Sequence, residues 1–315
     1  MMKNLSYRLL YSVAYLLSLL PFRVLYVLSD GLFVLVYYII RYRRKLVMTN
    51  LSTSFPEQSQ AELGRIERQF YHWLCDYVVE TLKLLSISND QLLQHIEFRG
   101  VDQLEEVFDQ GRNCAAILGH YCNWEWLSAS GLAFKRHPQA VTGLIYHPLY
   151  NEAFDRLFVA LRSAHGGVCV PKNDILRSLI GYKREDRRSL FGYISDQSPK
   201  WENMHLWLPF LHHDTPVFTG GERIMRKMND AVFYVDMERP SRGHYICTFR
   251  LVAAQAASEE EFAITRRFYE MLEQNIRRQP SFYLWTHNRW KRGREEFERK
   301  YDVVDGKIIR KEAYK

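Results

Sequence analysis

His120 and Glu125 are the residues whose types and spacing most directly suggest chemistry in this sequence. They follow an apolar run, residues 115–118, that ends at Gly119, and four residues separate them. The run is typical of a buried strand, and Asn123 can cap a new helix with Glu125 in its first turn. We expect His120 on the intervening loop, with Glu125 close enough to orient its ring. A base held by an acid at a strand end is what proton abstraction from a hydroxyl requires. The pair alone is equally compatible with ordinary surface loop residues.

The elements that must position this pair alternate between short apolar runs and amphipathic segments. Strands are predicted over residues 140–146, 168–170, 189–194, 231–236 and 245–252. Helices are predicted over residues 59–86, 151–163, 173–182 and 259–278, with a further helix starting at Thr215-Pro216. This alternation favours one α/β catalytic domain, with a mixed, largely parallel central sheet flanked by helices. Active groups are expected at the carboxyl ends of its strands.

Two further polar sites follow predicted strands. Residues 146–148, which include His147, come after one strand, and Asp196-Gln197 come after another. Together with His120 they favour a shared site, because ligands of open α/β sheets bind outside the carboxyl ends of the strands. Each also has a simpler interpretation, since His147 suits a turn and Asp196 could cap the following loop.

Residues 5–40 are the most apolar part of the sequence, and a basic cluster follows them at residues 41–45. The apolar pattern is interrupted by Pro21, Arg23 and Asp30-Gly31, so both a spanning helix and a helical hairpin lying in the membrane interface fit it. The basic flank favours the cytoplasmic face and anionic head groups. We therefore expect residues 1–45 to be a membrane-anchoring helical segment and residues 46–315 to form the catalytic domain.

The composition narrows the function classes. The net charge of +7 favours anionic partners. The five cysteines are scattered, which indicates reduced core residues rather than a disulfide or zinc framework. Cys122 lies two residues from His120, but nothing in its surroundings marks it as an activated nucleophile. His205, His212 and His213 lack carboxylate or cysteine companions at metal-ligand spacing, so no metal site is expected.

Several sequence blocks resemble the bacterial lipid A late acyltransferases, the lauroyl and myristoyl transferases of the wider glycerolipid acyltransferase superfamily. The blocks are Arg43-Arg44, Asn50-Leu51, Ser54-Phe55-Pro56-Glu57, the His120-x4-Glu125 pair, Tyr146-His147-Pro148-Leu149-Tyr150, Asp196-Gln197 and the segment from Tyr283 to Lys291. The histidine and acid pair is a weak signal by itself, and its combination with the flanking blocks is more specific. The Phe-Pro-Glu-Gly-Thr-Arg block of glycerol-phosphate acyltransferases is missing.

This resemblance implies a glycerolipid-acyltransferase-like fold and an inner-membrane enzyme that needs no cofactor and has no nucleic-acid partner. The enzyme would move a fatty acyl chain from acyl carrier protein to a hydroxyl of a lipid A precursor. The resemblance also implies His120 as general base and Glu125 as its partner, with Arg162, Asp196 and Arg289 near the substrate. Two alternatives remain open: the same chemistry on a lysophospholipid or an amino-acid-based lipid, and an inactive membrane-surface binding protein with the same fold.

Overall fold

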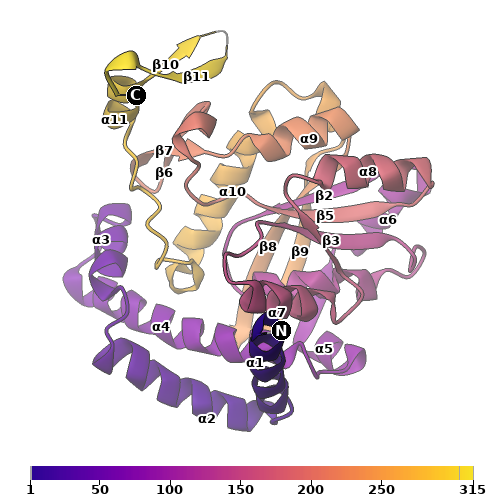
Figure 1. Cartoon of the computed structure of the whole chain (residues 1–315), viewed down its shortest axis with the longest axis vertical. Helices are drawn as coiled ribbons and strands as arrows, with labels where there is room; N and C mark the ends of the chain where they lie inside the picture. The colour runs from indigo at the N-terminus through magenta and orange to yellow at the C-terminus, as the bar shows by residue number, and fades with distance from the viewer. Residues whose placement is uncertain (1, 305, 315) are drawn as a thin grey trace.

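The protein is built around a seven-stranded mixed sheet, seen in a computed structural model that describes residues 2–304 and 306–314 (Figure 1). Its strand order is β1-β9-β8-β2-β5-β3-β4. The strands are β1 (Ile96–Arg99), β2 (Cys114–Leu118), β3 (Val141–Tyr146), β4 (Val168–Pro171), β5 (Ser189–Ile194), β8 (Ala231–Ser241) and β9 (His244–Ala253). Every neighbouring pair is parallel except β8 and β9. The prediction of a mixed, largely parallel central sheet is confirmed.

Helices flank this sheet, as the alternating pattern predicted. They are α6 (Val101–Asp109), α7 (Glu152–Ser163), α8 (Ile175–Arg184), α9 (Gly220–Met228) and α10 (Ala263–Arg278). The central strand β2 is buried along its whole length. This burial explains its continuous apolar sequence, because a parallel strand covered on both faces has no solvent side to mark with polar residues.

The long helix α4 (Gln60–Lys83) confirms the amphipathic helix predicted over residues 59–86. The Ser59 side chain accepts from the Glu62 backbone N–H, and the Glu62 carboxylate accepts from the Ser59 backbone N–H. This reciprocal capping box satisfies two backbone donors that a helix start otherwise leaves unpaired. The apolar face of α4 then buries Phe70 and Trp73 completely.

Residues 2–54 are mostly helical, and the predicted interruption at Pro21 is confirmed, whereas the one predicted at Asp30-Gly31 is wrong because α2 continues through it. Helix α1 (Met2–Ser18) ends before Pro21, and α2 (Phe22–Phe33) continues into a π-helical turn, η1 (Val34–Ile39). Helices α3 (Arg44–Ser54) and α5 (Asn89–His95) complete the N-terminal half. The segment Phe22–Ile39 is long and apolar enough to cross a membrane, and 22% of it is buried. Ala14 and Phe33 join the main hydrophobic core, so the boundary at residue 45 stays a prediction.

Two local predictions are wrong. Thr215-Pro216 do not start a helix but lie in β7 (His213–Val217), which pairs with β6 (Leu206–Phe210) in a separate hairpin. Proline is tolerated there because a two-stranded hairpin consists of edge strands. The Asn123 side chain does not cap a helix either; it donates to Glu80 at 2.9 Å, and the following segment is the 3₁₀ helix η2 (Trp124–Ala133).

The remaining elements were not predicted. They are α11 (Arg294–Lys300), the hairpin of β10 (Tyr301–Val304) and β11 (Lys307–Arg310), and the 3₁₀ turns η3 (Trp201–Asn203), η4 (Ala256–Ser258), η5 (Pro280–Phe282) and η6 (Glu312–Tyr314). The β10–β11 hairpin lies at the opposite end of the molecule from α1 and α2 (Figure 1). It packs around a small second core of Met204, Phe297 and Tyr301.

Candidate active site

His120 and Asp196 meet because β2 and β5 are adjacent and parallel. Each residue comes shortly after the end of its strand, so both reach the same edge of the sheet. Gly119 permits the close approach: a Cβ there would lie 2.8 Å from a Leu272 methyl carbon and 3.4 Å from the Asp196 carboxyl carbon. The site is therefore built by sheet topology between segments 76 residues apart.

The Asp196 carboxylate holds the His120 ring. Its Oδ1 lies 2.7 Å from Nδ1 of the ring, and the carboxylate is 2% exposed. Burial raises the pKa of Asp196, but the His120 charge, hydrogen bonds from the His120 ring and backbone N–H, and the charge of Arg289 together bring it below its ordinary value. A buried carboxylate kept ionised beside Nδ1 fixes which ring nitrogen carries the proton.

The other ring nitrogen of His120 faces a different kind of partner. Its Nε2 lies 3.2 Å from the Nε2 amide nitrogen of Gln197, which is a donor. With Asp196 accepting at Nδ1 and Gln197 donating at Nε2, the neutral ring is the tautomer protonated on Nδ1. The His120 side chain is 18% exposed, so Nε2 is the basic nitrogen available for a proton.

Glu125 does not orient this ring directly, and that prediction is corrected. Arg162 binds both of its oxygens, with Nε at 2.6 Å from Oε2 and Nη2 at 2.7 Å from Oε1. Tyr77 and the indole N–H of Trp124 also donate to Oε1. Glu125 reaches His120 only through Trp124, whose ring stands edge-on to the imidazole at a centroid distance of 5.0 Å. Asp196 therefore takes the place beside His120 that was predicted for Glu125, and Glu125 pairs with Arg162 instead.

The Glu125–Arg162 pair is buried and strongly bonded. The side chains are 2% and 17% exposed. Burial lowers the pKa of Arg162, but the Glu125 hydrogen bond and charge more than offset this and raise it above its ordinary value. A bidentate arginine–carboxylate pair of this kind is both strong and geometrically specific, so it fixes the position of η2 next to His120.

Arg289 lies beneath the site rather than at its surface. It is 1% exposed and donates to the Pro216 carbonyl at 2.7 Å and to the Tyr269 hydroxyl at 3.2 Å. Its charge lowers the pKa of Asp196. Burial and the charge of the same carboxylate raise the pKa of the Tyr283 hydroxyl well above its ordinary value. Arg289 thus lies where its charge stabilises the ionised form of Asp196.

The segment that carries Tyr283 and His287 closes the site from the C-terminal side. Tyr121 and Tyr283 form an antiparallel bridge, and the Leu284 N–H donates to the His120 carbonyl at 3.1 Å. The sequence marked this segment only through the family resemblance. Tyr77, Trp124 and His287 were not predicted as site residues, and no periodic or spacing signal in the sequence distinguishes them from core aromatics.

The other histidines considered from the sequence lie elsewhere. His147 is exposed, and its Nδ1 contacts the adjacent Pro148 carbonyl. His213 stacks on Trp290 with ring centroids 4.0 Å apart. Within the described ranges, no cluster of three His, Cys, Asp or Glu side chains is arranged to hold a metal ion.

The Cys122→Ser variant is expected to retain most of the activity of the parent protein. The Cys122 thiol is fully buried, and burial raises its pKa well above the ordinary value, so it is not a thiolate near neutral pH. Initial rates of the variant and the parent protein would check this. Complete loss of activity in a variant that melts at the parent temperature would restore the thiol as a nucleophile.

His287 is expected to make the fold less stable as the pH falls from about 6.5 to 4. Burial lowers its pKa to about 4, against 6.5 for the free side chain. Between pH 6.5 and 4 the His287 side chain is protonated in the unfolded chain but neutral in the folded one. The free energy of unfolding is therefore highest above pH 6.5 and decreases as the pH falls. The loss reaches roughly 3 kcal/mol for this residue.

The measurement is thermal unfolding from pH 7 to 4 in His287→Gln, with His147→Gln as an exposed control. The His287 variant should lose less stability with decreasing pH than the parent, and the control should follow the parent. Identical pH profiles for all three proteins would exclude a low pKa for His287.

The family comparison decides what kind of enzyme this site belongs to. The family of bacterial lipid A biosynthesis acyltransferases matches residues 3–292. The chain belongs to this family. It is 21% identical over 273 residues to a lipid A biosynthesis palmitoleoyltransferase of Escherichia coli, covering 86% of each chain. It is 21% identical over 282 residues, 89% of each chain, to a lipid A biosynthesis lauroyltransferase of the same organism. A lipid A biosynthesis acyltransferase of Haemophilus influenzae is 20% identical over 270 residues, 86% of this chain and 82% of that relative.

Membership in this lipid A acyltransferase family confirms the resemblance seen in the sequence blocks. The matched range includes the candidate site residues from His120 to Arg289 and also most of α1 and all of α2. Residues 5–40, the most apolar part of the sequence, therefore lie within the range that the family matches.

Proposed function

We propose that the protein is a membrane-associated O-acyltransferase that moves a fatty acyl chain from an acyl carrier protein thioester to a hydroxyl of a lipid A precursor. The proposal places it at the inner membrane, with the catalytic residues on the cytoplasmic face. The observation that carries it is the His120–Asp196 pair at the carboxyl ends of the adjacent strands β2 and β5, in a chain of the lipid A acyltransferase family.

His120 is proposed as the general base. Its Nε2 removes the proton of the acceptor hydroxyl while the oxygen attacks the thioester carbonyl. The carbon–sulfur bond then breaks, and the imidazolium returns the proton to the carrier thiolate, so an ester and a free thiol result. A thioester is already activated, and no covalent intermediate on the enzyme is needed. General-base assistance of this type contributes about 10²–10⁴-fold in rate.

Asp196 and Arg289 are proposed as positioning residues in this scheme. Both are almost completely buried, so they act on the substrate through His120 rather than by touching it. Asp196 keeps the proton on Nδ1 and stabilises the imidazolium. The charges of His120 and Arg289 keep the carboxylate of Asp196 ionised.

Glu125 and Arg162 are proposed to shape the wall of the site next to the base. The guanidinium uses its Nε and one terminal nitrogen on Glu125. Its other terminal nitrogen is the candidate donor for the oxyanion of the tetrahedral intermediate, which needs donors aimed at that oxygen. Glu125 contributes by holding Arg162 and the indole of Trp124.

A basic group beside the site is proposed to bind phosphate of the acceptor lipid. Arg43 donates to the Thr286 carbonyl at 2.9 Å, and Arg292 donates to the Pro199 carbonyl at 3.1 Å. Lys291 adjoins Arg292 in the sequence, and burial, Arg292 and Arg43 together lower its pKa. The three cations flank His287, whose pKa in turn responds to the charge of His120.

The test is the mass spectrum of lipid A from cells with and without the gene. The proposal predicts that deletion removes one ester-linked acyl chain from lipid A and that the intact gene restores it, whereas the His120→Gln form does not. Unchanged lipid A accompanied by altered phospholipid acylation would assign the enzyme to a lysophospholipid acceptor instead.

A further inference from the structure

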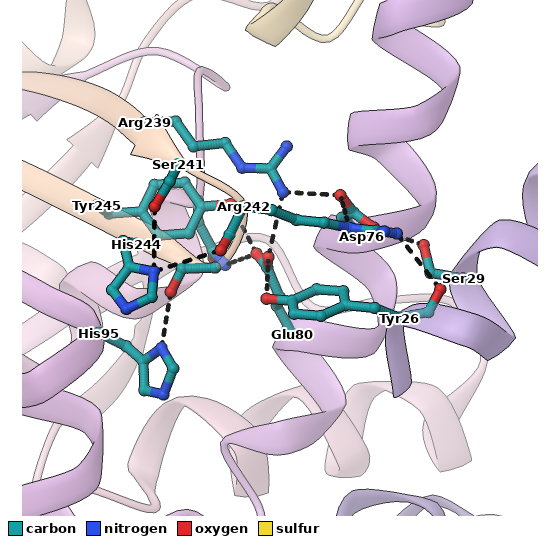
Figure 2. Close-up of polar contacts among 12 residues, drawn as sticks. Tyr26, Ser29, Asp76, Glu80, His95, Arg239, Ser241, Arg242, His244 and Tyr245 are labelled. Carbon is teal, nitrogen blue, oxygen red and sulfur yellow. Dashed lines mark hydrogen bonds and ion pairs between the residues drawn. The ribbon is translucent and has the colours of Figure 1, made fainter. Parts of the chain in front are cut away.

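Helix α2 has two chemically different faces. Its inner face carries hydroxyls bonded to acids of α4, with Tyr26 donating to Glu80 at 3.0 Å and Ser29 to Asp76 at 2.7 Å (Figure 2). Its outer face is apolar and exposed. Exposed large apolar side chains there and along η1 are Val24, Val27, Leu28, Val34, Leu35, Tyr38 and Ile39. A helix surrounded by lipid on all sides would have no carboxylates beside it to accept these hydrogen bonds.

The two acids belong to a charged network that reaches into the central sheet. Asp76 and Glu80 are 3% and 0% exposed. Arg239 of β8 lies 2.7 Å from Asp76 and 3.5 Å from Glu80, and Tyr245 of β9 donates to Glu80 at 2.6 Å.

Arg242, in the turn between β8 and β9, contacts Asp76 at 2.6 Å (Figure 2). It also contacts Asp30 of α2 at 2.6 Å. Removing one partner from such a buried network leaves an uncompensated charge, so α2 is firmly attached to the domain that holds the site.

The segments on either side of α2 are attached to the same helix, α4. At the first end, Lys83 donates to the carbonyls of Ser18 and Leu20, at 2.8 and 3.0 Å. At the far end, Glu67 accepts from Tyr37 of η1 at 3.1 Å and pairs with Arg44 of α3 at 2.8 Å. Lys83 and Glu67 are sixteen positions apart, so α2 together with η1 follows α4 for roughly 24 Å.

A spanning orientation is incompatible with this attachment. A helix that crosses the bilayer has its ends on opposite sides of about 30 Å of hydrocarbon. Because α4 lies alongside α2, its acids and the arginines of the β8–β9 hairpin would have to enter the hydrocarbon too, where charged groups are costly.

Helix α1 shows the same division into faces. Leu5, Leu9, Val13 and Leu16, at helical spacing, are exposed on one side. The other side packs against α7 and α4, where the Arg156 guanidinium lies 3.9 Å from the Tyr7 ring centroid. Thus the helix before α2 also lies on the domain that contains His120.

We propose that α1 and α2 lie in a single leaflet, with their outer faces immersed and the N-terminus on the same side of the bilayer as the catalytic site. The partner is an anionic phospholipid surface, because residues 1–45 contain seven Lys or Arg and one acidic residue. This inference rests on the membrane association in the proposed function, and it is independent of the acyl-transfer chemistry.

The test uses the full chain with one epitope tag at each terminus, expressed and recovered in sealed inside-out inner-membrane vesicles. Added protease should remove both tags to the same extent, while a periplasmic marker protein inside the vesicles stays intact. Protection of the N-terminal tag alone would place the two termini on opposite sides and overturn the single-leaflet arrangement.

Spin labels at Leu9→Cys, Val27→Cys and Ile39→Cys, in a Cys169→Ala background, provide a second measurement in vesicles containing phosphatidylglycerol. All three labels should report similar shallow depths within one leaflet. A label at the bilayer midplane between two shallow ones would show spanning and overturn the inference, while acyl transfer by the same sample keeps the proposed function. Failure to bind these vesicles would overturn both the inference and the membrane association.

Discussion

Replacement of His120 by glutamine is expected to lower the rate of acyl transfer by about 10²–10⁴-fold without unfolding the protein. The glutamine amide can still donate to Asp196, so the buried carboxylate keeps a partner, but it cannot accept a proton from the acceptor hydroxyl. The measurement is the initial rate with acyl carrier protein thioester, together with the melting temperature. The loss should appear in the chemical step, while membrane binding stays unchanged.

Two further variants make this prediction specific to the His120–Asp196 pair. Asp196→Asn should also lose activity, by up to about 10⁴-fold, because an amide no longer fixes the tautomer or stabilises the imidazolium. His147→Ala, which alters an exposed histidine shortly after a neighbouring strand, should remain fully active. Wild-type rates in His120→Gln, or equal losses in all three variants, would remove His120 from the role of base.

Glu125→Gln is expected to destabilise the protein by about 3–5 kcal/mol. The substitution leaves the guanidinium of Arg162, 17% exposed, without the carboxylate that compensates its charge. For a chain of this length the melting temperature should fall by roughly 5–8 °C, and activity should fall with it because η2 and Trp124 lose their anchor. This outcome differs from that of a purely catalytic acid, whose replacement would leave stability unchanged.

A double-mutant cycle distinguishes a structural role of Glu125, in the ion pair with Arg162, from a direct role in the chemistry. If the pair acts as a structural unit, Glu125→Gln/Arg162→Gln should be less unstable than the sum of its single variants, with a coupling of about 1–3 kcal/mol. Arg99→Gln breaks an exposed arginine–glutamate pair with Glu97 and should leave the melting temperature unchanged. Stability equal to the parent in Glu125→Gln would show that the ion pair contributes nothing and would favour a direct role in the chemistry.

Local signals made much of the fold predictable. The apolar run that became β2, the Ser59 and Glu62 cap of α4, and the strand that became β5 are each specified within a few residues of sequence. Where the structure was set by tertiary partners the prediction was wrong. Thr215-Pro216 has the composition of a helix start, yet the edge of the β6–β7 hairpin accommodates it, and the Trp290 indole donates to the Thr215 hydroxyl at 2.9 Å.

Tertiary contacts also determine which residues pair in the candidate site, so the sequence predicted its members better than their partners. His120 and Asp196 each follow a predicted strand. Their pairing, however, depends on β2 lying next to β5, and residue spacing does not reveal the order of strands in a sheet. Glu125 is near His120 in the sequence, and this proximity suggested a direct contact between the two side chains that the structure does not contain. Its actual partner, Arg162, lies 37 positions further along the chain.

The most direct test of the proposed activity is acyl transfer by the purified full-length protein in anionic phospholipid vesicles. The reaction would contain acyl carrier protein thioester with a lipid A precursor and a lysophospholipid as competing acceptors, and mass spectrometry would identify the products. We predict one new ester-linked chain on the lipid A precursor, with one carrier thiol released for each ester formed, and no product with His120→Gln. Acylation of the lysophospholipid alone, or undiminished transfer by His120→Gln, would contradict the assignment.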